Sequence, residues 1–180
     1  MYSRTSRMVI IGLAGSILLG GAGAAEAGLL SDNNGGAIPA FTGSQLFDSD
    51  QGTPGFTVSA NVDYAVFAPG DFGSAFPGQD PSGGADYVYA YQIENLDTDV
   101  SKLTVGLDGD EPLGAIGFVS DAGLFDPTAS AYVGAGPTSA AWDFTAPSAL
   151  PRDNSSAILI FTSAAAPEWD SATVSAEWFS

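Results

Sequence analysis

The sequence contains no cysteine and no histidine among its 180 residues. Without cysteine the chain forms no disulfide and carries no lipid attached to a cysteine. Ser-His-Asp and Cys-His catalytic groups cannot be built, and zinc, copper and haem lose their usual ligands. We therefore expect a protein that is not an enzyme and has no resident cofactor, with calcium as an optional ion.

Basic residues are almost as scarce. The chain has four Lys and Arg against 21 Asp and Glu, a formal net charge of −17. Nucleic acids and anionic membrane surfaces carry the same sign and are repelled. Because the acids are scattered rather than gathered in runs, they are typical of a solvated surface in salty surroundings.

The one long apolar run lies at the N-terminus. Arg4 and Arg7 precede it, residues 8–24 form it, and small-x-small cleavage sites end at Ala24 and Ala27. The run is shorter than the roughly 20 residues of a membrane span and holds five glycines. These features predict a signal peptide over residues 1–27 and a secreted protein, extracellular or in the cell envelope. Cleavage would leave two basic residues against 20 carboxylates, a charge of −18.

Residues 28–180 are predicted to form a single antiparallel β-sandwich, or jelly-roll-like, domain of 7–9 strands. A loop-rich lead-in (28–54) holds one short strand near 38–41, and strict alternation of apolar side chains then begins at Phe56. Further strands are predicted at 86–94, 101–107, 114–120, 131–133, 140–146, 156–163 and 171–179. The strand at 156–163 is apolar on both faces, which favours a place inside a sheet. Residues 69–85 are rich in Gly and Pro and predict a long loop.

The strand at 86–94 places Tyr87, Tyr89 and Tyr91 on one face, because residues two apart in a strand share a face. Two interpretations follow. The rings could form an exposed platform for a sugar, a role that Trp169 and Trp178 could supply instead, or they could be ordinary core. The opposite face carries small or polar side chains, which favours the core interpretation.

Carboxylates offer two further hypotheses. Asp48 and Asp50 lie in one oxygen-rich turn and Asp108 and Asp110 in another, so each turn is a candidate calcium site. Neither fits the EF-hand spacing, and aspartate also forms turns without a metal by capping backbone amides. Glu94 and Glu177 form a candidate acid pair for a glycosidase-type hydrolase, although no sequence signature accompanies them.

Two stretches resemble segments of the PEP-CTERM proteins, which are exported bacterial proteins sorted to the envelope or the extracellular matrix. Residues 87–105 carry the strand pattern Tyr-x-Tyr-x-Tyr-Gln-x-x-Asn, and residues 155–175 carry Ser-x-x-Leu-x-Phe-Thr-Ser before a proline turn. The resemblance implies an exported β-sandwich without an assigned catalytic activity. The family's C-terminal Pro-Glu-Pro motif, apolar span and basic cluster do not follow Pro167-Glu168-Trp169, so we expect either a truncated chain or a relative released without an anchor.

Together these observations favour a secreted, non-catalytic bacterial protein with a structural or adhesive role at the envelope or in the matrix. The alternative is a carbohydrate-binding module, with calcium as an optional stabiliser. The expected partners are extracellular polysaccharide or other matrix proteins, and neither nucleic acid nor an anionic membrane surface.

Overall fold

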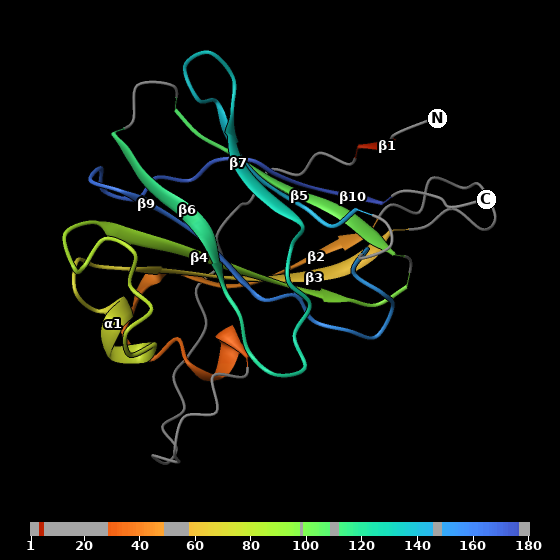
Figure 1. Cartoon of the computed structure of the whole chain (residues 1–180), viewed down its shortest axis with the longest axis horizontal. Coiled ribbons are helices and arrows are strands. Elements are labelled where there is room, and N and C mark those ends of the chain that lie inside the picture. The colour runs from red at the N-terminus through yellow and green to blue at the C-terminus, as the bar shows by residue number, and fades with distance from the viewer. Residues whose placement is uncertain are drawn as a thin grey trace.

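Two β-sheets, stacked face to face, make up the protein (Figure 1). The structure is a computed structural model that describes residues 4–5, 29–48, 58–97, 99–108, 112–145 and 149–176. The predicted signal peptide therefore lies outside the described residues, apart from Arg4 and Thr5.

Each sheet has five strands, and every pairing between them is antiparallel. Sheet A has the order β1 (Arg4–Thr5), β10 (Ala172–Ala176), β5 (Val100–Gly106), β8 (Ser139–Asp143) and β7 (Ala129–Val133). Sheet B has the order β2 (Ala37–Asp48), β3 (Ser59–Phe67), β4 (Tyr87–Asn95), β9 (Ile158–Ser163) and β6 (Leu113–Val119). The predicted all-β antiparallel sandwich is confirmed, and β9 lies inside its sheet as expected.

The main core fills the space between the sheets. Sheet B contributes the side chains that alternate along β3 and β4, among them Val62, Val66 and Ile93, and sheet A contributes Leu103 and Trp142. The Trp142 ring is fully buried, and its Nε1–H donates a hydrogen bond of 2.7 Å to the Gly117 carbonyl of β6. This bond joins the two sheets across the core.

Sheet B is also covered on its outer face, by segments that the sequence does not predict as helical. The helix α1 (Phe72–Ala75) lies in the predicted loop at 69–85, and the 3-10 helix η1 (Leu30–Asp32) lies in the lead-in. Their buried side chains form a second core against β3, β4 and β9. Figure 1 shows α1 on the side of sheet B away from sheet A.

A buried glutamine ties η1 to sheet B. Gln92 of β4 is 2% exposed, and its Oε1 accepts a hydrogen bond of 2.7 Å from the Leu30 N–H. Its Nε2 donates one of 2.8 Å to the Ser156 carbonyl. The polar residue on the outer face of β4 is thus part of the second core rather than a solvated side chain.

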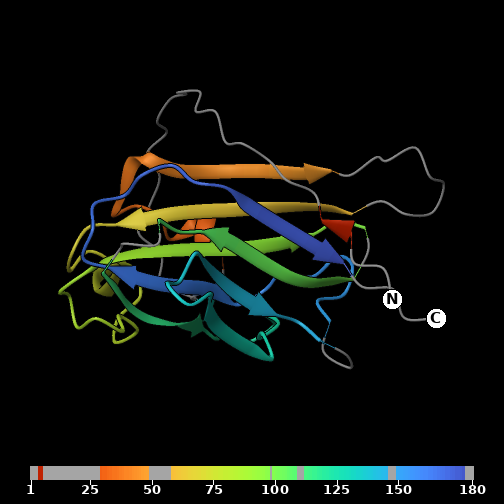
Figure 2. The same cartoon turned by 90° about the horizontal axis from the view of Figure 1, so that it is seen from above.

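The strand β2 is much longer than the short strand predicted near residues 38–41. It runs for 12 residues because it pairs with β3 over most of its length, and it forms an edge of sheet B (Figure 2). The sequence did not indicate this length for two reasons. The lead-in is rich in turn-forming residues, and the pairing of a strand depends on a partner elsewhere in the chain.

Candidate functional site

A pocket of about 170 Å³ opens between the two sheets, where residues 164–171 cross from β9 in sheet B to β10 in sheet A. Its inner wall is apolar and includes Tyr89, Tyr91 and Phe161 of sheet B and Val105 of sheet A. At its mouth lie three aromatic and three acidic side chains, named here the aromatic rim (Phe41, Tyr64 and Trp169) and the acidic rim (Asp108, Glu168 and Asp170).

Phe41 reaches the pocket because β2 is bulged. The register passes from Ala37 opposite Phe67 to Thr42 opposite Ala65, so residues 38–41 face the single residue Val66. The Thr42 hydroxyl closes the bulge by donating a hydrogen bond of 3.0 Å to the Ile38 carbonyl. Bulges of this kind redirect a side chain at a sheet edge, which here adds Phe41 to the aromatic rim.

Trp169 comes from the β9–β10 connection and packs on the other two rings of the aromatic rim. Its ring centroid lies 5.1 Å from that of Phe41 and 5.8 Å from that of Tyr64, the latter in an edge-to-face arrangement. These contacts hold the indole at the mouth of the pocket while 44% of its surface stays exposed. A held but exposed indole can lie against an incoming ligand.

Tyr64 lies close to β2 because its register partner there is Gly43. A Cβ atom at position 43 would be 2.6 Å from the tyrosine Oη and 2.9 Å from Cζ, so a side chain there would collide with the ring. Burial raises the pKa of Tyr64 above its ordinary value of 10.0. The phenol is therefore protonated at neutral pH and contributes no charge to the pocket.

The acidic rim depends on a second glycine, Gly106 of β5. A Cβ atom there would lie 2.8 Å from Cγ of Asp170, and the Gly106 N–H donates a hydrogen bond of 2.7 Å to the Ser171 carbonyl. Glu168 and Asp170 line the pocket together with Asp108, and all three residues are exposed. The carboxylates can therefore contact both solvent and a ligand at the mouth.

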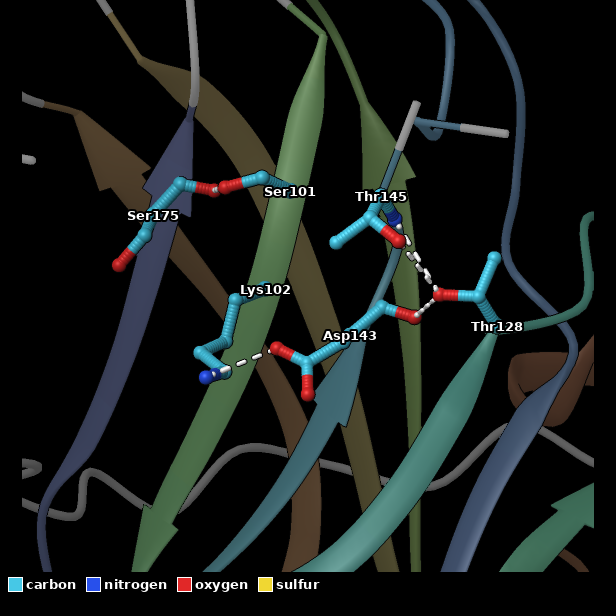
Figure 3. A network of polar contacts seen from close by, with 6 residues as sticks. All are labelled: Ser101, Lys102, Thr128, Asp143, Thr145 and Ser175. Atoms are coloured by element: carbon cyan, nitrogen blue, oxygen red, sulfur yellow. Dashed lines mark hydrogen bonds and ion pairs between the residues drawn. The ribbon is translucent and has the colours of Figure 1, made fainter. Parts of the chain in front are cut away.

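The basic side chains that the structure describes lie elsewhere. Lys102 Nζ is 2.8 Å from a carboxylate oxygen of Asp143, its cross-strand partner on the outer face of sheet A, as Figure 3 shows. The Asp143 carbonyl in turn accepts a hydrogen bond of 2.9 Å from the Thr128 hydroxyl. Arg152 lies within 4.0 Å of Asp97 and Asp153. Neither cation is among the residues that line the pocket.

The predicted tyrosine face turns inward. Tyr89 is 6% exposed and stacks on Phe161 at 4.5 Å, and its hydroxyl donates a hydrogen bond of 3.3 Å to the Ala165 carbonyl. Tyr87 and Tyr91 are partly buried and pack against the main core. The three rings form no exposed platform, but Tyr89 and Tyr91 line the same pocket as Trp169, whereas Tyr87 does not.

Only some of the candidate metal and acid residues lie in the part of the chain that the structure describes. Asp48 is exposed at the end of β2, Asp108 belongs to the acidic rim, and Asp50 and Asp110 lie outside the described residues. Within the described ranges no group of three or more Asp, Glu, His or Cys is placed to hold a metal ion. Glu94 is exposed on the outer face of β4, and Glu177 lies outside the described residues.

Sequence reasoning missed four residues of the mouth: Phe41, Tyr64, Glu168 and Asp170. Tyr64 lies in phase with the core residues of its strand, which was the one signal that could have placed it between the sheets. The others lie in turn-rich stretches where periodicity carries no information.

The fold and the pocket define the protein as an all-β sandwich with a small ligand-sized site between its sheets. No family model, curated protein or solved structure matches the chain significantly. Among the residues that the structure describes, no helix has the length and hydrophobicity needed to cross a membrane.

Proposed function

We propose that this chain is a secreted, non-catalytic binding module that holds one sugar unit of an extracellular polysaccharide in the pocket between its sheets. Adhesion to a matrix or envelope glycan is the role that such a module serves. The observation that carries the proposal is the lining of the pocket, which combines aromatic rings with carboxylates. The signal-peptide pattern at 1–27 supports an extracellular setting.

Each part of the pocket matches a part of a sugar. Aromatic rings offer flat apolar faces for the C–H groups of a pyranose, and Trp169 keeps 44% of its surface exposed for this contact. Carboxylate oxygens accept hydrogen bonds from hydroxyl groups, and the acidic rim supplies three carboxylates. The volume of about 170 Å³ is below the roughly 300–1,000 Å³ of drug-sized sites, which favours a single ring as the occupant.

The purified protein should be screened on a glycan array, with and without a calcium chelator, and each hit measured by titration calorimetry. Trp169→Ala is expected to weaken binding about tenfold, because it removes the exposed ring of the aromatic rim. Phe118→Ala is the matched control, since Phe118 is also an exposed aromatic side chain, at 38%, but does not line the pocket.

Three outcomes would contradict the proposal. Absence of binding to every glycan would leave a purely structural role. Equal losses in Trp169→Ala and Phe118→Ala would place the binding surface elsewhere. Recovery of the protein from the cytoplasm of its native host would remove the extracellular setting.

A further inference from the structure

We infer that the pocket selects a positively charged occupant, namely a sugar unit that carries a free, protonated amine. The inference rests on the proposed function for the sugar, but the preference for a cation has its own evidence in the charges and rings at the mouth. It separates amino sugars from the neutral and acidic sugars that other polysaccharides contain.

The charged residues that line the pocket, among those that the structure describes, all have one sign. They are Asp108, Glu168 and Asp170, and Tyr64 adds no charge because burial raises the pKa of its phenol. The described cations do not offset them, because Lys102 is engaged with Asp143 on the outer face of sheet A (Figure 3). The sequence as a whole adds a net charge of −17 to the same field. Such a field draws cations toward the pocket and repels anions.

The aromatic rim reinforces the preference for a cation. The faces of indole and phenol rings attract ammonium groups, and the attraction is stronger where the contact is shielded from solvent. Trp169 lies between Glu168 and Asp170 in the sequence, and all three line the pocket with Tyr64, so aromatic rings and carboxylates face the same occupant. A neutral sugar gains only the ring contact and hydroxyl hydrogen bonds.

An organic cation fits this site better than a metal ion. A calcium site uses six to eight oxygen ligands, whereas the described residues provide no group of three placed to hold a metal. The apolar inner wall, with Tyr89, Phe161 and Val105, would also leave part of a metal ion without ligands. A protonated amine on an apolar ring suits both the wall and the mouth.

The test is titration calorimetry at low salt and at a mildly acidic pH, where the amino groups of a glucosamine oligomer are protonated, with three matched oligosaccharides. They are built from glucosamine, from N-acetylglucosamine and from glucuronate, so the amine is present, neutralised by acetylation, or replaced by an acid. We expect the glucosamine oligomer to bind about tenfold more tightly than its acetylated form, and the glucuronate oligomer to show no measurable binding. The advantage of the amine should shrink as salt is raised to about 0.5 M, because the carboxylates are exposed.

Single charge-removing variants then locate the preference. Glu168→Gln and Asp170→Asn are each expected to weaken binding of the glucosamine oligomer about two- to fivefold, the range for exposed ion pairs, and to leave the acetylated oligomer unaffected. Glu94→Gln is the matched control, because it removes the same charge from an exposed glutamate outside the pocket. It should change neither affinity.

The outcomes separate this inference from the proposed function. Equal binding of the glucosamine and N-acetylglucosamine oligomers would overturn the charge preference and leave sugar binding in place. If no oligosaccharide binds but tetramethylammonium does so in a Glu168-dependent way, the preference for a cation stands and the sugar function falls. Binding of none of these probes would overturn both the sugar function and the preference for a cation. An equal loss of affinity in Glu94→Gln and Glu168→Gln would overturn the preference alone.

Discussion

Replacing Gln92 with leucine should remove the hydrogen bond that joins η1 to sheet B and lower the free energy of unfolding substantially. Gln92 is 2% exposed and makes two hydrogen bonds, of 2.7 Å from the Leu30 N–H and of 2.8 Å to the Ser156 carbonyl. Leucine is close to glutamine in size, so the change removes both bonds and leaves little cavity. Two buried backbone groups are left without the partner they have in the native protein.

The magnitude follows from those two groups. A buried polar group that loses its partner costs about 1–3 kcal/mol. Two such groups, less a small gain from the apolar leucine, give a loss of about 2–5 kcal/mol in the free energy of unfolding. The whole free energy of unfolding of a typical domain is about 5–15 kcal/mol, so the effect is well within reach of measurement.

Urea denaturation of the two proteins measures the loss, and hydrogen exchange followed by NMR locates it. In Gln92→Leu the Leu30 amide is expected to exchange far faster than in the unmodified protein, because its acceptor is gone. Gln45→Leu is the control. The Gln45 side chain donates a hydrogen bond of 3.0 Å to the adjacent Leu46 carbonyl at an exposed site, so its loss should change stability by no more than about 0.5 kcal/mol. An unchanged urea midpoint together with a protected Leu30 amide in Gln92→Leu would refute the reasoning.

Three further changes test the packing around the pocket. Gly43→Ala should lower the free energy of unfolding by about 1–3 kcal/mol in a urea titration, because the new Cβ would lie 2.6 Å from the Tyr64 Oη. Gly117→Ala is the control, since the space around its Cβ is open, and should change that free energy by no more than about 0.5 kcal/mol. Equal effects of the two substitutions would contradict the close approach. Trp142→Phe should lose about 2–4 kcal/mol, because it removes buried volume and the bond to the Gly117 carbonyl, and a loss below about 1 kcal/mol would show that the bond between the sheets matters little. Above pH 10 the unfolded chain ionises Tyr64, whereas the folded chain keeps the proton because its Tyr64 pKa is raised, so the free energy of unfolding falls as pH rises. Urea midpoints from about pH 9 to 11 should therefore decline more steeply in the unmodified protein than in Tyr64→Phe. Parallel declines would contradict this expectation.

Local periodicity was enough to predict most strands. The alternation of Ala60, Val62, Tyr64 and Val66 predicted β3 and its inward face, and the strand carrying Tyr89 and Tyr91 was predicted within a residue of β4. The reason is that the two-residue repeat of a strand is written in consecutive residues. Which side of a strand is the more apolar can therefore be seen without knowing its neighbours.

What covers a face cannot be seen in this way. Val88, Ala90 and Gln92 are small or polar, yet η1 and α1 bury them beneath a second core. Leu30 and Gln92 are 62 positions apart, and no local pattern in either segment indicates the other. The same holds for β2, whose length depends on its pairing with β3.

From the sequence by itself the fold class could be predicted, the inward direction of Tyr89 and Tyr91 was the favoured interpretation, and the acidic composition was known. Only the tertiary structure decided where a ligand could bind. Phe41 and Trp169 are more than a hundred positions apart, and their rings meet at 5.1 Å only because a bulge turns one toward the pocket and the β9–β10 connection carries the other across the sheets. Such a site forms only when the sheets pack against each other. The repeat of side chains within one segment indicates which face of the strand is buried, but it does not indicate which distant segment lies nearby.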